Sequence, residues 1–282
     1  AQPRAKRFET PDAAVLALIE AAAAEGPEQL EAILGPDLAE MVSGDPVADT
    51  ADRAWFVENA RVSAQIEDEN SNSALLVIGP DDWPFPIPLA KDDEGWFFDT
   101  KAGLEELVNR RVGLNEIFTL AALRSFVEAQ REYAAIDPMG QGFQVYADRI
   151  LSSEGKRDGL YWPTKPGEPA SPFGPLVAEA VAAGYSPAGE GPRPFHGYLY
   201  KVLTAQGERA QGGAMSYLRE GHLTQGFALL AWPASYGRSG IMTFQVNQKG
   251  IVYEKDLGED TATLAKGIET FDPGEGWRAS VD

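Results

Sequence analysis

The apolar positions in the first hundred residues predict helices followed by strands. Thr10 is a helix-capping residue and Pro11 fits the first helical turn, so a helix is expected to start there. Apolar residues recur at helical spacing over 13–24. Two further helices are expected over 28–34, which glycine and proline residues flank, and over 52–60. Strand-like apolar runs follow at 73–78, 86–90 and 96–98. The order of these elements predicts a small α+β module over residues 1–102, with helices covering a curved antiparallel sheet.

The remainder of the chain, residues 103–282, shows one long helical pattern and then a series of strands. Apolar residues with a period near that of a helix run from 103 to 136, and Gly113 is expected to kink this helix. A Gly/Pro-rich loop over 155–194 follows, interrupted by a helix over 175–183. Five strand-like runs with turns between them occupy 198–204, 214–219, 224–232, 241–247 and 251–256. This module is therefore predicted to pack its long helix on an antiparallel β-meander.

Both modules resemble known architectures. The first is similar to the cone-shaped fold of nuclear transport factor 2, in which helices cover a curved sheet. The second is similar to bacterial pilins, in which a long helix packs on an antiparallel sheet, although it lacks the hydrophobic N-terminal anchor of a pilin. These likenesses imply an α+β fold in two modules, and as analogies of architecture they imply no function.

Five segments of the chain also resemble one protein family. They are 83–88 (WPFPIP), 110–116 (RRVGLNE), 158–163 (DGLYWP), 194–207 (PFHGYLYKVLTAQG) and 226–258, which begins GFALLAWP and ends YEKDLG. In these segments, spread over nearly the whole chain, the sequence is similar to exported bacterial proteins grouped as domain of unknown function 2950. The resemblance implies a secreted or periplasmic protein. It supplies no catalytic residues, because that family has no assigned reaction.

Acidic residues outnumber basic ones, most strongly near the start of the chain. The sequence has 43 Asp and Glu against 24 Lys and Arg, for a net charge of −19, so no nucleic-acid partner is expected. The first 100 residues hold 21 of the acids and 6 of the bases. This excess either serves solubility, the simpler interpretation, or attracts a cationic partner or a metal. The apolar runs stop after about six residues, so no transmembrane segment is expected.

The composition and the start of the chain bear on the compartment. There is no cysteine, which excludes disulfides, thiol nucleophiles and thiolate-bound zinc or iron. Ala1, Gln2 and Pro3 resemble the residues left after signal-peptide cleavage, although trimming of the chain would give the same start. We therefore expect a periplasmic or secreted protein whose signal peptide was removed before Ala1.

Two segments invite comparison with calcium-binding loops. Asp68 begins a segment with oxygen ligands at three alternating positions, but the glycine and the final glutamate of such a loop are missing. The segment Asp137–Asp148 has aspartates at its first and twelfth positions and Gly142 at its sixth. Met139 occupies the third position, and a thioether is a poor calcium ligand. A capped turn is therefore favoured over calcium at 137–148, and no cofactor or other metal is expected.

The sequence offers no convincing set of catalytic residues. Ser239 lacks the surrounding pattern of a nucleophile elbow and is expected in a turn. His196 is expected at the start of a strand, where its ring bonds a backbone carbonyl, in preference to a general base. Adjacent acids such as Asp81 and Asp82 are expected to point into water. We therefore assign no catalytic residue.

Aromatic residues concentrate in the second module and form the predicted binding site. Tyr198 and Tyr200 lie two residues apart in a predicted strand, so both point to one face of the sheet. The loop over 155–194 is long enough to fold over that face, and a groove between loop and sheet would take a ligand. The residues assigned to this site are Tyr161, Trp162, His196, Tyr198, Tyr200, Trp232 and Tyr236. The simpler alternative is that these rings fill the core of a loop-rich domain.

These observations favour a non-enzymatic binding or assembly factor of the cell envelope, with an envelope protein or a glycan as its partner. The alternative is an envelope enzyme that acts on a polymer or a small ligand through the cleft between the modules or through the aromatic loop. A third alternative is a structural subunit that exchanges a strand at a sheet edge.

Overall fold

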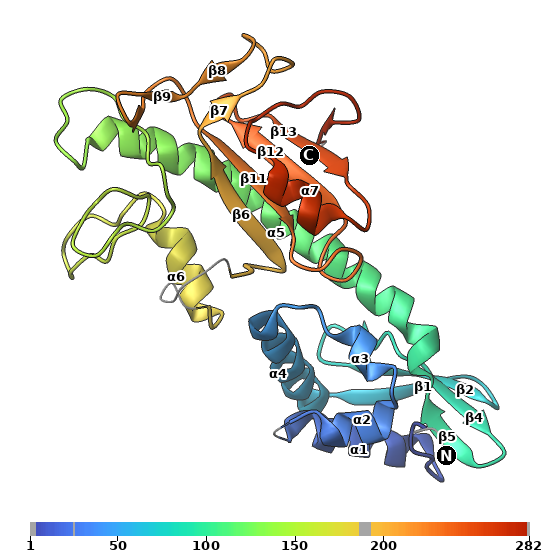
Figure 1. Ribbon diagram of the computed structural model, residues 1–282. Coiled ribbons are helices and arrows are strands. Elements are labelled where there is room, and N and C mark those ends of the chain that lie inside the picture. The colour runs from blue at the N-terminus through green and yellow to red at the C-terminus, as the bar shows by residue number, and fades with distance from the viewer. Residues whose placement is uncertain (1–3, 25, 186–192, 281–282) are drawn as a thin grey trace. The chain divides into compact units, whose positions relative to one another are not determined.

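The computed structural model describes residues 4–24, 26–185 and 193–280, so Ala1 and residues 186–192 of the expected loop lie outside it. The chain divides into two compact units, Ala1–Arg111 and Val112–Asp282. The boundary lies inside the long helix α5 (Thr100–Ile136), so unit 1 and unit 2 each contain part of one helix (Figure 1). The sequence pattern placed the end of its first module at the start of this helix instead.

Unit 1 consists of helices that cover an antiparallel sheet. The helices are α1 (Pro11–Ala23), α2 (Glu28–Leu34), α3 (Leu38–Met41) and α4 (Pro46–Val62). The strands are β1 (Ala64–Asn70), β2 (Ser73–Ile78), β3 (Trp83–Pro84), β4 (Leu89–Asp92) and β5 (Gly95–Phe98). They pair in the order β1-β2-β4-β5, and β3 also pairs with β2. This is the α+β arrangement predicted for the start of the chain.

Capping side chains set the starts of the two longer helices of unit 1. The Thr10 hydroxyl accepts the backbone N–H of Ala13 at 3.2 Å at the start of α1. Asp45 caps α4 in the same way by accepting two backbone N–H groups of its first turn, and Pro46 follows it. α4 therefore starts earlier than the helical segment expected from residue 52.

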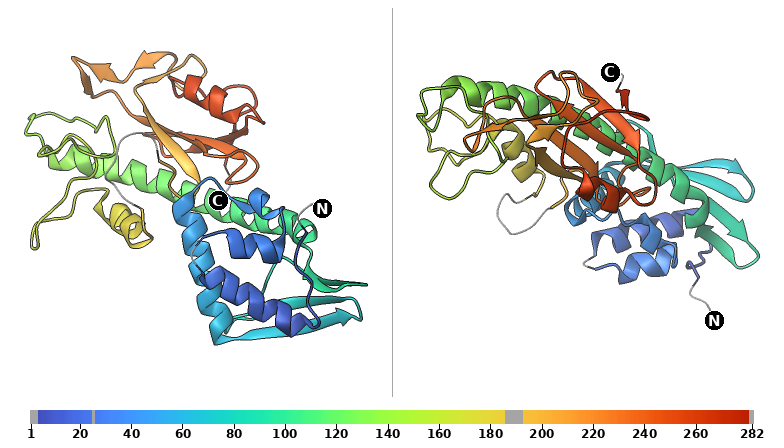
Figure 2. Two further views of the ribbon diagram at one scale, coloured as in Figure 1. Left: turned by 60° about the horizontal axis from the view of Figure 1, so that its bottom comes forward. Right: turned by 45° about the horizontal axis from the view of Figure 1, so that its top comes forward.

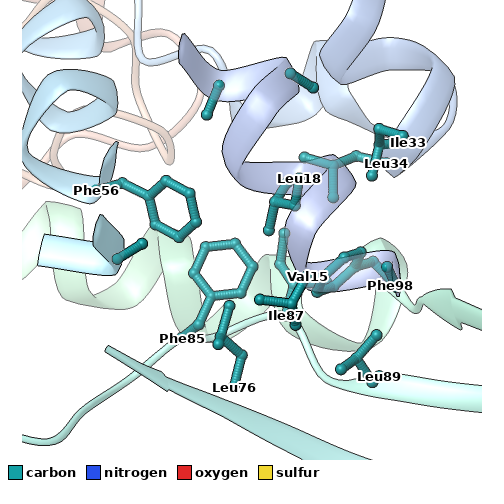
Figure 3. Close-up of a cluster of buried hydrophobic side chains, with 14 of the residues drawn as sticks. Val15, Leu18, Ile33, Leu34, Phe56, Leu76, Phe85, Ile87, Leu89 and Phe98 are labelled. Carbon is teal, nitrogen blue, oxygen red and sulfur yellow. The ribbon is translucent and has the colours of Figure 1, made fainter. Parts of the chain in front are cut away.

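The inner faces of the helices bury a hydrophobic core against the sheet (Figure 3). Leu18 and Phe56 lie on helices, and both are buried together with Phe85, Ile87 and Phe98. The Phe85 ring lies 5.1 Å from that of Phe56 and 6.0 Å from that of Phe98. Each fully buried side chain of this size contributes about 1.5–3 kcal/mol to folding, so this core holds the helices and the sheet of unit 1 together.

The strand β1 is absent from the predicted elements because its side chains are polar. Ile66 is half-buried, and the other residues of β1, including Glu67, Asp68 and Glu69, are exposed. The backbone of β1 pairs with β2 from Ala64 to Asn70, with one irregularity between Asp68 and Asn70, and backbone pairing needs no apolar side chains. β1 is therefore an edge strand that a hydrophobicity pattern does not reveal.

Unit 2 has an antiparallel sheet at its centre. Its helices besides α5 are α6 (Gly174–Ala182) and α7 (Thr261–Gly267). The sheet contains β6 (Tyr198–Leu203), β11 (Ala228–Pro233), β12 (Met242–Asn247), β13 (Val252–Asp256) and β14 (Arg278–Ala279), in the order β14-β13-β12-β11-β6. β7 (Ala205–Gln206) pairs with β8 (Met215–Ser216), and β9 (Leu218–Arg219) pairs with β10 (His222–Leu223). The predicted antiparallel meander with a long helix is confirmed, except that the strand expected over 214–219 is replaced by β8 and β9, which lie outside this sheet. α7 and β14 are additional elements.

The helices α5 and α7 cover opposite faces of this sheet (Figure 2). Leu123, Phe126 and Val127 of α5 share a core with residues of β6, β11 and β12. Ala265 of α7 and Trp232 of β11 belong to a second core on the other face. The sheet is therefore packed on both sides, and every residue of β11 is buried.

The helix α5 runs without a break through Gly113, where a kink was expected. A Cβ added at Gly113 would meet no atom within 4 Å, so no close packing contact requires a glycine there. Although α5 has 37 residues, none of the helices in the described part of the chain is both long and apolar enough to span a bilayer.

Candidate functional site

Several of the predicted site residues lie in the interior of unit 2. Tyr198 and Trp162 are buried in the core that α5 covers. Trp232 is buried on the opposite face of the sheet. Tyr200 is half-buried on the same face as Tyr198, and its hydroxyl lies 3.4 Å from that of Thr119 in α5. The two tyrosines therefore share a face, as their spacing indicates, and α5 packs against that face.

Tyr161 and Tyr236 lie near the same sheet. Tyr161 is half-buried and packs against the core that contains Trp162, so the described part of the expected loop 155–194 supplies side chains to the interior. Tyr236 is half-buried, and a hydrogen bond with the Asp256 carboxylate raises the pKa of its hydroxyl. Tyr161 therefore contacts the core of unit 2, and Tyr236 is hydrogen-bonded to Asp256.

A set of hydrogen bonds ties α5 to the sheet where two of the family-like segments meet. The side-chain amide of Asn115 donates to the backbone oxygen of Ser239 at 2.8 Å. Glu116 Oε1 accepts the backbone N–H groups of Ile241 and Met242, each at 3.0 Å. These bonds satisfy backbone groups at the start of β12 and hold α5 against it.

Two glycines let the chain close tightly at this junction. Gly197 has φ of +72°, and a Cβ there would lie 2.9 Å from the Cβ of Ser239. A Cβ on Gly240 would lie within 2.5 Å of two ring carbons of Tyr198. The Tyr198 hydroxyl itself donates to the Met242 backbone oxygen at 2.9 Å. Close packing and hydrogen bonds therefore fix the strand ends and α5 together.

His196 lies at the centre of an aromatic cluster next to this junction. Its ring stacks on Phe118 of α5, with centroids 4.3 Å apart and planes 15° apart. The rings of Phe195 and Tyr185 lie 4.5 and 5.6 Å from it, and its backbone N–H donates to the Tyr185 hydroxyl at 3.1 Å. We call Phe118, Tyr185, Phe195 and His196 the His196 cluster.

The backbone of His196 is in an unusual conformation. Its φ of +48° lies in the left-handed region, which costs a residue with a side chain about 1–3 kcal/mol. Such strain persists where the surroundings hold it, and here the stack on Phe118 and the turn at Gly197 do so. The imidazole is half-buried and stacks on Phe118, so a predicted site residue contacts a residue of the long helix that the sequence pattern predicted.

Three neighbouring large apolar side chains of α5 are exposed together, one of them in the His196 cluster. Leu114 is 56% exposed, Ile117 65% and Phe118 41%. Residues spaced three and four apart lie on one side of a helix, and we call these three side chains the α5 apolar face. They are among the apolar positions that predicted the helix over 103–136, and periodicity does not distinguish apolar positions that meet the sheet from those that meet solvent.

Of the other candidate sites of the sequence, Asp68 lies in β1, whereas Asp137 and Ser239 lie in turns. Asp137 accepts the backbone N–H groups of Gly142 and Gln141, each at 2.8 Å, and these bonds lower the pKa of its carboxyl. The hydroxyl of Ser239 donates to the backbone oxygen of Ser235 at 3.1 Å. Within the described ranges, no three His, Asp or Glu side chains gather in a way that could hold a metal ion.

A hollow of about 540 Å³ lies between α1 and α4 in unit 1. Alanines of α1 line one side, and Arg53, Val57 and Arg61 of α4 are among the residues on the other. Arg53 also donates to the backbone oxygen of Gly26 at 3.3 Å. None of the predicted site residues lines this hollow.

Comparison with known protein families agrees with the resemblance seen in the sequence. A family model with the description "Protein of unknown function (DUF2950)" matches residues 5–280. No curated protein and no solved structure matches the chain. The matched range includes the His196 cluster and the α5 apolar face.

Proposed function

Because the chain belongs to the family of proteins of unknown function DUF2950, which carries no assigned reaction, we propose its function from the geometry of unit 2. The protein is a non-enzymatic binding or assembly factor of the bacterial cell envelope. Its partner is another protein, which docks on the α5 apolar face and on the adjoining His196 cluster. The joint exposure of Leu114, Ile117 and Phe118 is the observation that carries this proposal.

The chemistry of the α5 apolar face favours a protein partner. Large apolar side chains that are exposed together mark surfaces that bind other proteins. Burial of one such side chain contributes about 1.5–3 kcal/mol, so a partner that covers Leu114, Ile117 and Phe118 gains from each of them. Tyr185 and Phe195 add aromatic side chains, a type enriched at protein interfaces.

The α5 apolar face is held in position from the opposite side of the helix. Asn115 and Glu116 lie between Leu114 and Ile117 in the chain and bond the backbone of Ser239 and Ile241. The helix therefore presents these side chains on a rigid base, and a partner pays little conformational entropy to order them.

The envelope location rests on the similarity to exported bacterial proteins. Fractionation of the native host tests it, and we expect the protein in the periplasmic or the secreted fraction. Recovery in the cytoplasmic fraction alone would reject this part of the proposal and leave the docking face to be tested separately.

A photo-crosslinking amino acid at Phe118 tests the docking face directly. The matched control carries it at Leu264 on α7, which is 49% exposed and lies in the same unit. We expect a discrete adduct with one envelope protein from position 118, no such adduct from position 264, and loss of the adduct when Ile117→Ser is added. Circular dichroism confirms that each variant is folded.

Three results contradict the proposal. The first is the same set of adducts from positions 118 and 264, which indicates random collision. The second is an adduct at 118 that Ile117→Ser leaves unchanged, and the third is the absence of any adduct with another protein.

A further inference from the structure

Unit 1 carries a separate aromatic surface built around an exposed tryptophan. Trp55 lies on α4 and is 45% exposed. Its ring meets the ring of Trp83 in β3 edge to face, with centroids 5.1 Å apart and planes 80° apart. The Trp83 ring lies 6.5 Å from that of Phe85, which is buried in the core. The tryptophan pair, Trp55 and Trp83, is therefore anchored on the core at one end and open to solvent at the other.

One ring of this aromatic surface, that of Trp83, already contacts a cationic side chain of unit 1. Cζ of Arg110 lies 5.1 Å from the centroid of the Trp83 ring. The guanidinium is held there by the backbone oxygen of Pro84 at 2.8 Å and by the Glu106 carboxylate at 2.6 Å. An indole attracts cations to its face because its π electrons make that face negative. Trp55 presents the same kind of ring to solvent.

Apart from Arg110, which is paired with Glu106, the charged residues next to Trp83 in the chain are acidic. Asp81 and Asp82 directly precede Trp83, and both are exposed. Unit 1 as a whole holds 23 acidic and 9 basic residues. A cation beside Trp55 is attracted both by the ring and by this charge, whereas an anion is repelled.

We infer that the tryptophan pair, together with Asp81 and Asp82, binds a basic segment of a protein partner and takes a Lys or Arg side chain over the exposed ring of Trp55. The edge-to-face geometry offers no two parallel ring surfaces on which a flat sugar chain could lie, and the carboxylates favour a cationic side chain over a neutral glycan. This site lies within unit 1 and does not depend on the docking face proposed for unit 2.

Calorimetric titration of the full chain with a hexalysine peptide tests this inference. A hexaglutamate peptide and chitohexaose serve as the anionic and the neutral glycan probes. We expect the protein to bind hexalysine and to bind neither hexaglutamate nor chitohexaose. Trp55→Ala should weaken it about fivefold, the size of a cation–π contact at an exposed site. The double variant Asp81→Asn with Asp82→Asn should weaken it by a similar factor, and Trp55→Phe should retain part of the affinity.

A matched control separates the site from general attraction by an acidic protein. Glu67→Gln with Asp68→Asn removes the same charge from exposed positions of β1 in the same unit. We expect this control to change the affinity for hexalysine by less than about twofold. An equal loss in the control and in the Asp81 and Asp82 variant overturns the inference, as does a Trp55→Ala protein that binds hexalysine unchanged. Chitohexaose binding that depends on Trp55 would assign the surface to a glycan instead.

Discussion

Replacement of Glu116 on α5 tests whether this carboxylate ties the helix to the sheet of unit 2. Its Oε1 accepts the N–H groups of Ile241 and Met242 at 3.0 Å, and the Tyr198 hydroxyl lies 3.4 Å from the same oxygen. Glu116→Gln keeps an oxygen that can accept both N–H groups but removes the charge. Glu116→Ala leaves both N–H groups without this acceptor.

The size of each effect follows from the burial of the groups concerned. Leaving a buried donor without a partner costs about 1–3 kcal/mol. Ile241 and Met242 are half-buried, so water reaches them in part, and we expect a loss of about 2–3 kcal/mol for both together in Glu116→Ala. Glu116→Gln exchanges charge-assisted bonds for neutral ones and should cost about 1 kcal/mol.

Hydrogen exchange of β12 is the appropriate measurement, because a chain with two units need not unfold in one step. A loss of about 2 kcal/mol in local stability speeds exchange about 30-fold. We expect this acceleration in the β12 amides of Glu116→Ala and a smaller one in Glu116→Gln, with β2 of unit 1 unchanged as the internal reference. Exchange in β12 that Glu116→Ala leaves unaltered would refute the reasoning. Equal acceleration in both variants would show that the charge matters and the accepting oxygen does not.

Three further predictions concern stability. Gly113→Ala should raise stability by about 0.5–1 kcal/mol, because alanine favours the helix and its Cβ meets nothing, and a lower melting temperature would contradict this. Gly240→Ala should lower the free energy of unfolding by about 1–3 kcal/mol, because its Cβ would overlap the ring of Tyr198. Urea denaturation measures this loss, and an unchanged midpoint would count against the packing described. Burial raises the pKa of Tyr133 and of Tyr217 to about 12, so their contribution to stability is present below pH 10 and is lost as the pH rises through about 12. Ultraviolet titration should show both still protonated at pH 11, and their ionisation near pH 10 would oppose this account.

The elements that the sequence predicted correctly carry local signals. The cap at Thr10 and the apolar spacing after it locate α1, and the short helix 28–34 has the bounds expected from its flanking glycine and proline residues. The apolar runs of β11 and β12, separated by a glycine-containing turn, correctly predicted the meander. β1 was missed because the polar side chains of Glu67, Asp68 and Glu69 give no apolar alternation, and only the backbone pairing with β2 defines the strand.

The candidate site was predictable only in part, because its contacts join residues far apart in the chain. The spacing of Tyr198 and Tyr200 correctly put both on one face of β6, but alternation does not say which face a helix covers. His196 was singled out from its position, whereas its stack on Phe118 spans more than seventy residues of sequence. The exposure of Phe118 and Ile117 depends on which side of α5 meets the sheet, and that is a property of the packed unit.

The polar edge strand β1 has a consequence for how copies of this protein behave when concentrated. Among the strands that the structure describes, β2 alone pairs with β1, so the outer backbone groups of β1 could template the strand of another molecule. Two copies meeting there would bring Glu67, Asp68 and Glu69 of each to within about 5 Å, the spacing of paired strands. Mutual repulsion of these carboxylates opposes that encounter. These acidic side chains, which make β1 undetectable by a hydrophobicity pattern, thus protect the protein against growth of fibrous aggregates from its sheet edge.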